Sequence, residues 1–185
     1  MVLTWVVLGK HVSSNDKGPY MKLIFLDIDG VLVTQRSTLA GDPWCASRNF
    51  DPVAVKILNK ITSHADVRLV ISSTWRFCEP SCRMALRVAG VTGIIYGDIK
   101  EDTAELTYSS RWWRTPLQGH HRGREIAEWF IESNPQNTES YAIIDDDSDF
   151  LPEQLPFFVK CDGEVGIGLK QYEKLLEILN LEHVM

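Results

Sequence analysis

The chain has 185 residues, a formal net charge of -6, 44% hydrophobic residues and 24% charged residues. These values are typical of one globular domain and argue against a disordered or fibrous chain, and the acidic balance argues against a protein that coats nucleic acid by bulk charge. The apolar runs are far shorter than the roughly 20 residues that cross a bilayer, so we expect no membrane span. The four cysteines form neither a zinc motif nor a disulfide scaffold, so we expect a cytoplasmic protein.

The N-terminal 20 residues differ from the rest of the chain. An apolar opening is followed by a polar stretch, without the correctly placed basic region and cleavage site of a signal peptide. We expect residues 1–20 to form either a flexible extension or an extra edge strand at residues 3–8. Residues 21–185 are expected to form a single domain.

From residue 22 onward, short apolar runs alternate with helix-like segments, which is typical of an α/β fold with a mainly parallel sheet. Five strands are predicted, at residues 23–26, 67–71, 94–96, 141–144 and 157–159. Four helices are predicted, at residues 52–62, 81–88, 123–131 and 170–179. Asp51 is the expected N-cap of the first helix, with Pro52 at its first position. Residues 34–50 and 97–119 are predicted to be long loops.

Aspartates follow two of the predicted strands at the point where each strand ends. Asp27 and Asp29 come directly after strand 23–26, and their spacing places both side chains on one side of the strand end. Four more carboxylates follow strand 141–144: Asp145, Asp146, Asp147 and Asp149. The carboxyl ends of parallel strands bind ligands, and clustered carboxylates repel each other unless a cation intervenes, so we predict a Mg²⁺ site. The alternatives are a turn-capping aspartate at the first strand end and a solvated acidic loop at the second.

The most basic stretch of the chain lies between residues 106 and 124, which contain no acidic residue. Arginines and aromatic rings occur together there, and this combination suits phosphate groups and nucleobases. The candidate substrate contacts are Arg111, Trp112, Trp113 and Arg114, together with Trp44 in the earlier loop. The alternative is that Trp112 or Trp113 packs under its own loop as a local core. Trp75 is expected to pack beneath the cleft.

Four motifs occur in order along the chain. They are Asp27-Ile-Asp29-Gly-Val-Leu, Ser72-Ser73-Thr-Trp-Arg, Arg122-Gly-Arg124-Glu-Ile and Ile-Asp145-Asp-Asp. In this order they resemble the motifs of the haloacid dehalogenase-like (HAD) superfamily of phosphohydrolases. Their particular form is similar to the HAD domains of "Swiss Army knife" RNA-repair proteins, and the resemblance covers about residues 21–179.

The resemblance implies a Rossmann-like three-layer fold, with a central sheet of about five strands, and a Mg²⁺-dependent phosphoric monoester hydrolase. It implies that Asp27 is the nucleophile that forms an aspartyl-phosphate, and that Asp29 is the general acid and base. The implied phosphate-binding residues are Ser72, with Ser73 as second choice, and Arg122, with Arg124 as its alternative. The implied metal ligands are Asp27, the Asp29 backbone carbonyl and Asp145, with Asp146 or Asp149 in support.

The spacing of the motifs leaves little room for a cap domain. The segment between Asp29 and Ser72 must hold a helix and a return strand, and the later position offers at most the 97–119 segment. In this superfamily an open cleft accompanies large substrates, so a nucleotide or nucleic-acid terminal phosphate is the leading substrate class. A phosphatase of free nucleotides or sugars, and a non-catalytic module that binds phosphorylated ends, are the alternatives.

Overall fold

The computed structural model describes residues 20–41, 49–98, 111–117, 119, 121–135 and 137–183. Within this part, four parallel strands form a sheet in the order β2-β1-β3-β4. The strands are β1 (Met21–Leu26), β2 (Val67–Ile71), β3 (Thr138–Asp145) and β4 (Phe158–Lys160). The predicted α/β fold with a parallel sheet is confirmed. The expected extension or edge strand at residues 1–20 lies outside the described residues, except for Tyr20.

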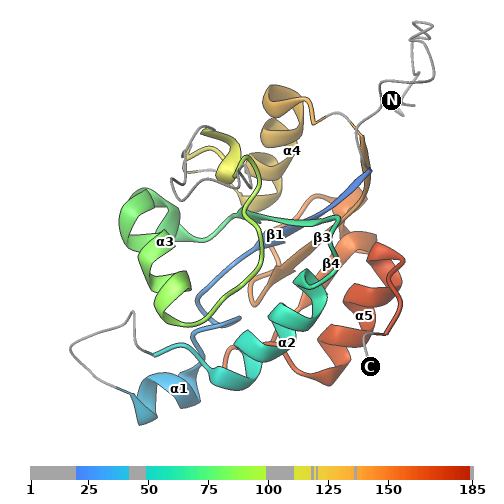
Figure 1. The fold of residues 1–185 in the computed structure, drawn as a ribbon. Coiled ribbons are helices and arrows are strands. Elements are labelled where there is room, and N and C mark those ends of the chain that lie inside the picture. The colour runs from blue at the N-terminus through green and yellow to red at the C-terminus, as the bar shows by residue number, and fades with distance from the viewer. Residues whose placement is uncertain are drawn as a thin grey trace, which may run out of the picture.

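Helices cover both faces of the sheet (Figure 1). The described helices are α1 (Gln35–Ala40), α2 (Pro52–Thr62), α3 (Glu79–Val88), α4 (Arg122–Ser133) and α5 (Leu169–Leu179). Helices α2 and α5 lie side by side on one face, and α4 lies on the other. Among the described residues, no helix is both long enough and apolar enough to cross a bilayer.

The side chains of β1 alternate between two hydrophobic cores, because successive residues of a strand point to opposite faces. Ile24 and Leu26 belong to the larger core, which contains the buried residues of α2, α3 and α5. Leu23 and Phe25 belong to the smaller core, where Phe25 meets the ring of Trp129 of α4 edge-on at 5.2 Å between centroids. Apolar residues on both faces are what a parallel sheet covered by helices requires, and they produce the three layers.

The strand predicted at residues 94–96 is reduced to a single bridge between Leu69 of β2 and Ile95. Two backbone hydrogen bonds hold it there: the Leu69 N–H donates to the Ile94 carbonyl (2.8 Å), and the Tyr96 N–H donates to the Leu69 carbonyl (2.7 Å). Gly97 follows with a positive φ of 86° and turns the chain away. The segment is therefore too short to extend the sheet as a strand.

Helix α1 lies inside a segment that the sequence predicts to be a loop. None of its residues is buried, so it shows no helical periodicity of apolar residues. A capping box forms it instead: the Ser37 N–H donates to Thr34 Oγ1 (3.1 Å), and the Thr34 N–H donates to Ser37 Oγ (2.9 Å). The rest of that predicted loop, residues 42–48 with Trp44, lies outside the described residues.

Asp51 caps α2, as predicted. Its Oδ1 accepts hydrogen bonds from the Val53 N–H (2.8 Å) and the Ala54 N–H (3.3 Å), and Arg36 Nε donates to its Oδ2 (2.6 Å). Burial opposes ionisation of this carboxyl, but the hydrogen bonds from Arg36 and the two amides outweigh burial and lower its pKa. Asp51 therefore ties the start of α2 to α1.

We predict that Asp51→Ala lowers the free energy of unfolding by about 1–2 kcal/mol, because it removes the helix cap. Urea unfolding measures this change, with an unchanged m-value as the check on two-state behaviour. Because the folded-state pKa lies below the ordinary value of 3.8, the stabilisation is complete above that value. The difference between the two proteins should shrink as the pH falls through the lower folded-state pKa. Arg36→Ala is the control and should have a much smaller effect, since the Arg36 side chain is half exposed; an equal effect would show that the cap is not the main contribution.

Candidate active site

Two buried carboxylates meet at the carboxyl edge of the sheet. Asp27 is the first residue after β1, and Asp145 is the last residue of β3. Leu26 pairs with Ile144 across the two strands, and the Asp27 N–H donates to the Ile144 carbonyl (3.0 Å), so the strand register places the two aspartates together. Asp27 is 4% exposed and Asp145 is fully buried. Asp146 joins them, and each of the three residues offers a carboxylate oxygen within 4.8 Å of the other two.

These three residues, which we call the acidic triad, offer a site for a cation. Asp145 Oδ1 accepts a hydrogen bond from the Asp147 N–H (2.9 Å), whereas Asp145 Oδ2 is buried without a hydrogen-bond partner. Burial, and then the repulsion between neighbouring carboxylates, raises the pKa of both Asp27 and Asp145. A divalent ion would coordinate Asp145 Oδ2, which accepts no hydrogen bond, and would offset the repulsion, so the donor set fits Mg²⁺.

Asp29 and Asp149 contribute no carboxylate to the acidic triad. Asp29 is exposed, and both of its carboxylate oxygens accept from Trp75 Nε1, at 3.1 and 3.0 Å. Its expected contribution to the metal is its backbone carbonyl rather than this side chain. The Asp149 carboxylate instead accepts from the Arg122 N–H (2.9 Å) at the start of α4. Asp149 thus orients the helix that follows the basic stretch.

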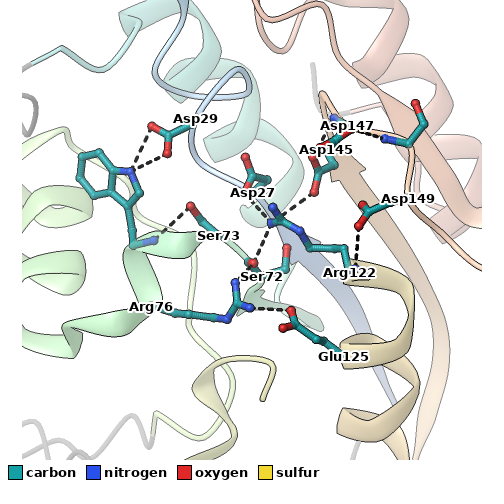
Figure 2. Close-up of polar contacts among 12 residues, drawn as sticks. Asp27, Asp29, Ser72, Ser73, Arg76, Arg122, Glu125, Asp145, Asp147 and Asp149 are labelled. Atoms are coloured by element: carbon teal, nitrogen blue, oxygen red, sulfur yellow. Dashed lines mark hydrogen bonds and ion pairs between the residues drawn. The ribbon is translucent and has the colours of Figure 1, made fainter. Parts of the chain in front are cut away.

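Arg122 is the basic residue that reaches the acidic triad (Figure 2). Its Nη1 donates to Asp27 Oδ1 (2.6 Å) and to the Ser72 carbonyl (2.7 Å), and it lies 3.4 Å from Asp145 Oδ2. Burial alone would lower the pKa of Arg122, but attraction to Asp145 and Asp27 outweighs burial and raises it. Arg124 is exposed on the opposite side of the helix, because side chains two positions apart in an α-helix point about 200° away from each other. Of the two predicted arginines, only Arg122 therefore lies at the acidic triad.

The two serines after β2 have different surroundings. Ser72 is fully buried, and its hydroxyl has no hydrogen-bond partner among the described residues. Ser73 Oγ accepts from the Trp75 N–H (3.4 Å) and caps the one-turn 3₁₀ helix η2 (Thr74–Phe77). Ser72 therefore offers a free donor beside Asp27 and Arg122, whereas the Ser73 hydroxyl has a structural contact.

A buried ion pair that the sequence reasoning missed joins the two predicted phosphate-binding segments. Arg76 Nη2 donates to Glu125 Oε2 (2.5 Å), and each side chain is 5% exposed. Arg76 Nη1 also donates to the Ser72 carbonyl, so the pair links the residues after β2 to the helix that carries Arg122. Both residues lie in motifs recognised in the sequence, and their opposite charges were the only local indication that they could pair.

The segment of residues 111–114, which holds two tryptophans between two arginines, contributes mainly to packing. For Trp113 the sequence left substrate contact and packing as alternatives, and the structure shows packing. Trp113 is 2% exposed and belongs to the larger core, because its short 3₁₀ helix η3 (Arg111–Trp113) lies against β2. Trp112 packs against the smaller core and is only partly buried. The Arg111 guanidinium stacks on Trp112 at 4.1 Å, and Arg114 lies 5.8 Å from the Trp113 ring. Trp44 lies outside the described residues.

An open groove of about 630 Å³ begins at the acidic triad. Its lining includes Asp29 and Asp146, together with Gln35, Thr38 and Leu39 of α1. No lysine or arginine lines the groove among the described residues. A separate cavity of about 660 Å³ beside α3 contains none of the predicted site residues. The groove, by contrast, adjoins Asp146 of the acidic triad.

The fold and the residues at this edge of the sheet define the class of protein. Acidic strand ends on β1 and β3, a serine after β2 and an arginine at the start of α4 are the arrangement of a Rossmann-like HAD domain. Across residues 23–172 the sequence matches the family described as "HAD domain in Swiss Army Knife RNA repair proteins", and the chain belongs to this family. This confirms the resemblance found in the sequence. Comparisons with curated proteins and with solved structures find no match.

Gly30 allows the acidic triad to assemble. It has a φ of +69°, and a Cβ placed on it would lie 2.1 Å from Asp146 Oδ2. Any side chain at this position must displace the Asp146 carboxylate. Gly90 is a matched position, with a φ of +82° and no atom within 4 Å of the added Cβ.

We predict that Gly30→Ala weakens Mg²⁺ binding by about 10-fold or more, because it displaces a ligand. The measurement is the rise in melting temperature on titration with Mg²⁺. Gly90→Ala is the control, since both changes cost about 1–2 kcal/mol of backbone strain, but only the first touches the acidic triad. Equal Mg²⁺ responses of the two variants would contradict the assignment of Asp146 as a ligand.

Proposed function

We propose that the protein is a Mg²⁺-dependent phosphatase that hydrolyses a phosphomonoester through an aspartyl-phosphate on Asp27. The leading substrate class is a nucleotide or nucleic-acid terminal phosphate. The observation that carries the proposal is the position of the Asp27 carboxylate, which is buried between Arg122 and the other two members of the acidic triad. Family membership supports a phosphohydrolase-type activity.

In the first step, an Asp27 carboxylate oxygen attacks phosphorus while the bond from phosphorus to the leaving oxygen breaks. Asp29 donates a proton to that oxygen, so the product leaves as an alcohol. Asp27 is then esterified to the phosphoryl group, and one difficult displacement has become two easier ones. The groove supports this assignment because Asp29 lines its wall, where a leaving group would lie.

In the second step, water attacks phosphorus and the bond from phosphorus to the Asp27 oxygen breaks. The Asp29 carboxylate formed in the first step takes the proton of this water, which restores both aspartates and releases inorganic phosphate. Asp29 is exposed beside the groove, where water can reach it. This exposure suits a group that must exchange a proton in each half of the cycle.

The phosphoryl oxygens carry negative charge and need positive partners near Asp27. Arg122 supplies a guanidinium within hydrogen-bond distance of Asp27, and the unpaired Ser72 hydroxyl supplies a donor. Asp27, Asp145 and Asp146 would hold Mg²⁺, with the Asp29 carbonyl as a further ligand, and the bound ion would neutralise phosphoryl charge and orient the attack. The pair between Arg76 and Glu125 fixes the position of Ser72 relative to Arg122.

A nucleic-acid or nucleotide end suits the groove outside the acidic triad. The wall contributed by α1 is uncharged and open, which leaves room for a substrate larger than the phosphate itself. The family description names RNA-repair proteins, which supports this class. Arg111 stacked on the partly exposed Trp112 offers a further contact for a phosphate or a base.

We predict that Asp27→Asn lowers Mg²⁺-dependent phosphate release by at least about 10³-fold, because an amide cannot act as the nucleophile. Release of phosphate from p-nitrophenyl phosphate measures the change, and EDTA should abolish the wild-type rate. Asp147→Asn is the matched control, since Asp147 is exposed and lies outside the acidic triad. Retained turnover in Asp27→Asn would exclude the aspartyl-phosphate mechanism.

We predict that kcat/KM is higher for a phosphate-ended oligonucleotide than for the matching mononucleotide, by about 10-fold, because additional contacts bind the longer substrate. Both terminal positions, 3′ and 5′, are compared at one salt concentration. The same oligonucleotide without its terminal phosphate is the competitor that measures binding of the chain alone. Equal kcat/KM values for the two substrates would favour a phosphatase of small molecules.

A further inference from the structure

A tryptophan that follows β2 contacts Asp29, the proposed general acid. Trp75 in η2 directs its indole N–H at Asp29, and Nε1 lies 3.1 Å from Asp29 Oδ1 and 3.0 Å from Oδ2. The two residues are 46 positions apart in the sequence. The fold therefore brings an aromatic donor from one strand end to the carboxylate of another.

Both partners of this contact are held in place by their surroundings. The Trp75 ring meets the buried Phe50 ring edge-on, at 5.6 Å between centroids and 82° between planes, and it packs against the larger core. The Asp29 backbone is fixed by its bridge to Val33, where the Gly30 N–H donates to the Val33 carbonyl (2.8 Å). The indole is thus a preorganised donor, and the exposed Asp29 carboxylate is the group that it orients.

The Asp29 carboxylate contacts Trp75 outside the acidic triad. Figure 2 shows Asp29 on one side of Asp27 and Asp145 on the other, and the Asp29 carboxylate also lines the open groove. An indole N–H donates a hydrogen bond but accepts none, so Trp75 cannot take the proton of Asp29. It can hold either oxygen of the carboxyl group while the other oxygen carries or receives the transferred proton. The same contact therefore serves both steps of the cycle.

We infer that Trp75 is a positioning residue, which holds the Asp29 carboxyl group toward the leaving-group side of Asp27 for proton transfer. The inference rests on the proposed function, because it assigns a partner to the general acid of that reaction. The contact is exposed to solvent, so its main contribution is orientation rather than stability. Its loss should affect the step in which the leaving oxygen needs a proton.

The test compares Trp75→Phe with the wild type on two substrates. A nucleoside 5′-monophosphate has an alkoxide leaving group that needs a proton, whereas p-nitrophenyl phosphate releases a stable anion. Under the proposed mechanism kcat/KM covers phosphoryl transfer to Asp27 and excludes the later hydrolysis. We expect a loss of about 10-fold or more on the nucleotide and of less than about 3-fold on the aryl phosphate, because only the first reaction depends strongly on general acid catalysis.

Trp129→Phe is the matched control. It also removes an indole N–H, which donates to the Trp112 carbonyl (2.9 Å) away from Asp29, so the ratio of the two kcat/KM values should stay at its wild-type value. Melting temperatures of both variants measure any effect on the fold. Phenylalanine keeps a ring against Phe50, so Trp75→Phe should fold.

A double-mutant cycle with Asp29→Asn gives the second readout. If Trp75 acts through Asp29, the additional loss from Trp75→Phe on the nucleotide should fall to less than about 2-fold once Asp29 is replaced, because coupled residues are not additive. Equal losses on the two substrates, additive losses in the cycle or faster turnover by Trp75→Phe would overturn the inference alone. No phosphate release by the wild-type protein from either substrate would overturn the proposed function and this inference with it.

Discussion

The pairing of β1 with β3 forces two buried carboxylates together, and the rest of the site depends on this constraint. The register that aligns Leu26 with Ile144 leaves Asp27 and Asp145 adjacent at the carboxyl edge of the sheet. Both side chains are buried, so both carboxyl groups have raised pKa values and need positive partners. Arg122 is one such partner, and the acidic triad is arranged to accept a cation as another.

The positive partner is itself positioned by a short chain of contacts. Asp149 accepts from the Arg122 backbone and fixes the start of α4, while Glu125 one turn further along pairs with Arg76 of η2. A buried ion pair of this kind adds little net stability, but loss of either partner leaves an uncompensated charge. The Arg76 and Glu125 pair is therefore best understood as a geometric link between Ser72 and Arg122.

Two consecutive residues of the turn after β2 make contacts in different directions. Arg76 points into the protein, toward the Ser72 carbonyl and Glu125, and Trp75 points toward Asp29. Two consecutive residues thus organise the phosphate-binding side and the proton-transfer side. One short turn positions both side chains, because Ser73 caps η2 and β2 directly precedes it.

Much of the fold was predictable because it follows from local patterns. The apolar run at 67–71 and the Asp51-Pro52 signal gave β2 and α2 with their observed bounds. Helix α1 was not predicted, because none of its residues is buried and a capping box is its main stabilising feature. The prediction of a strand at residues 94–96 was wrong. The apolar run favours a strand, but it cannot show that Gly97 turns the chain away after one bridge.

The sequence by itself determined the chemical groups available and their order: carboxylates at two strand ends, hydroxyls at a third and arginines before a helix. Residue type and strand periodicity are local properties, so a linear pattern can reveal them. Only the tertiary structure decided which members meet. It placed Arg122 at the acidic triad and Arg124 on the opposite side of α4, buried Trp113 in the core and brought Trp75 to Asp29. These outcomes depend on helix rotation, strand register and packing between distant segments, which no local pattern specifies.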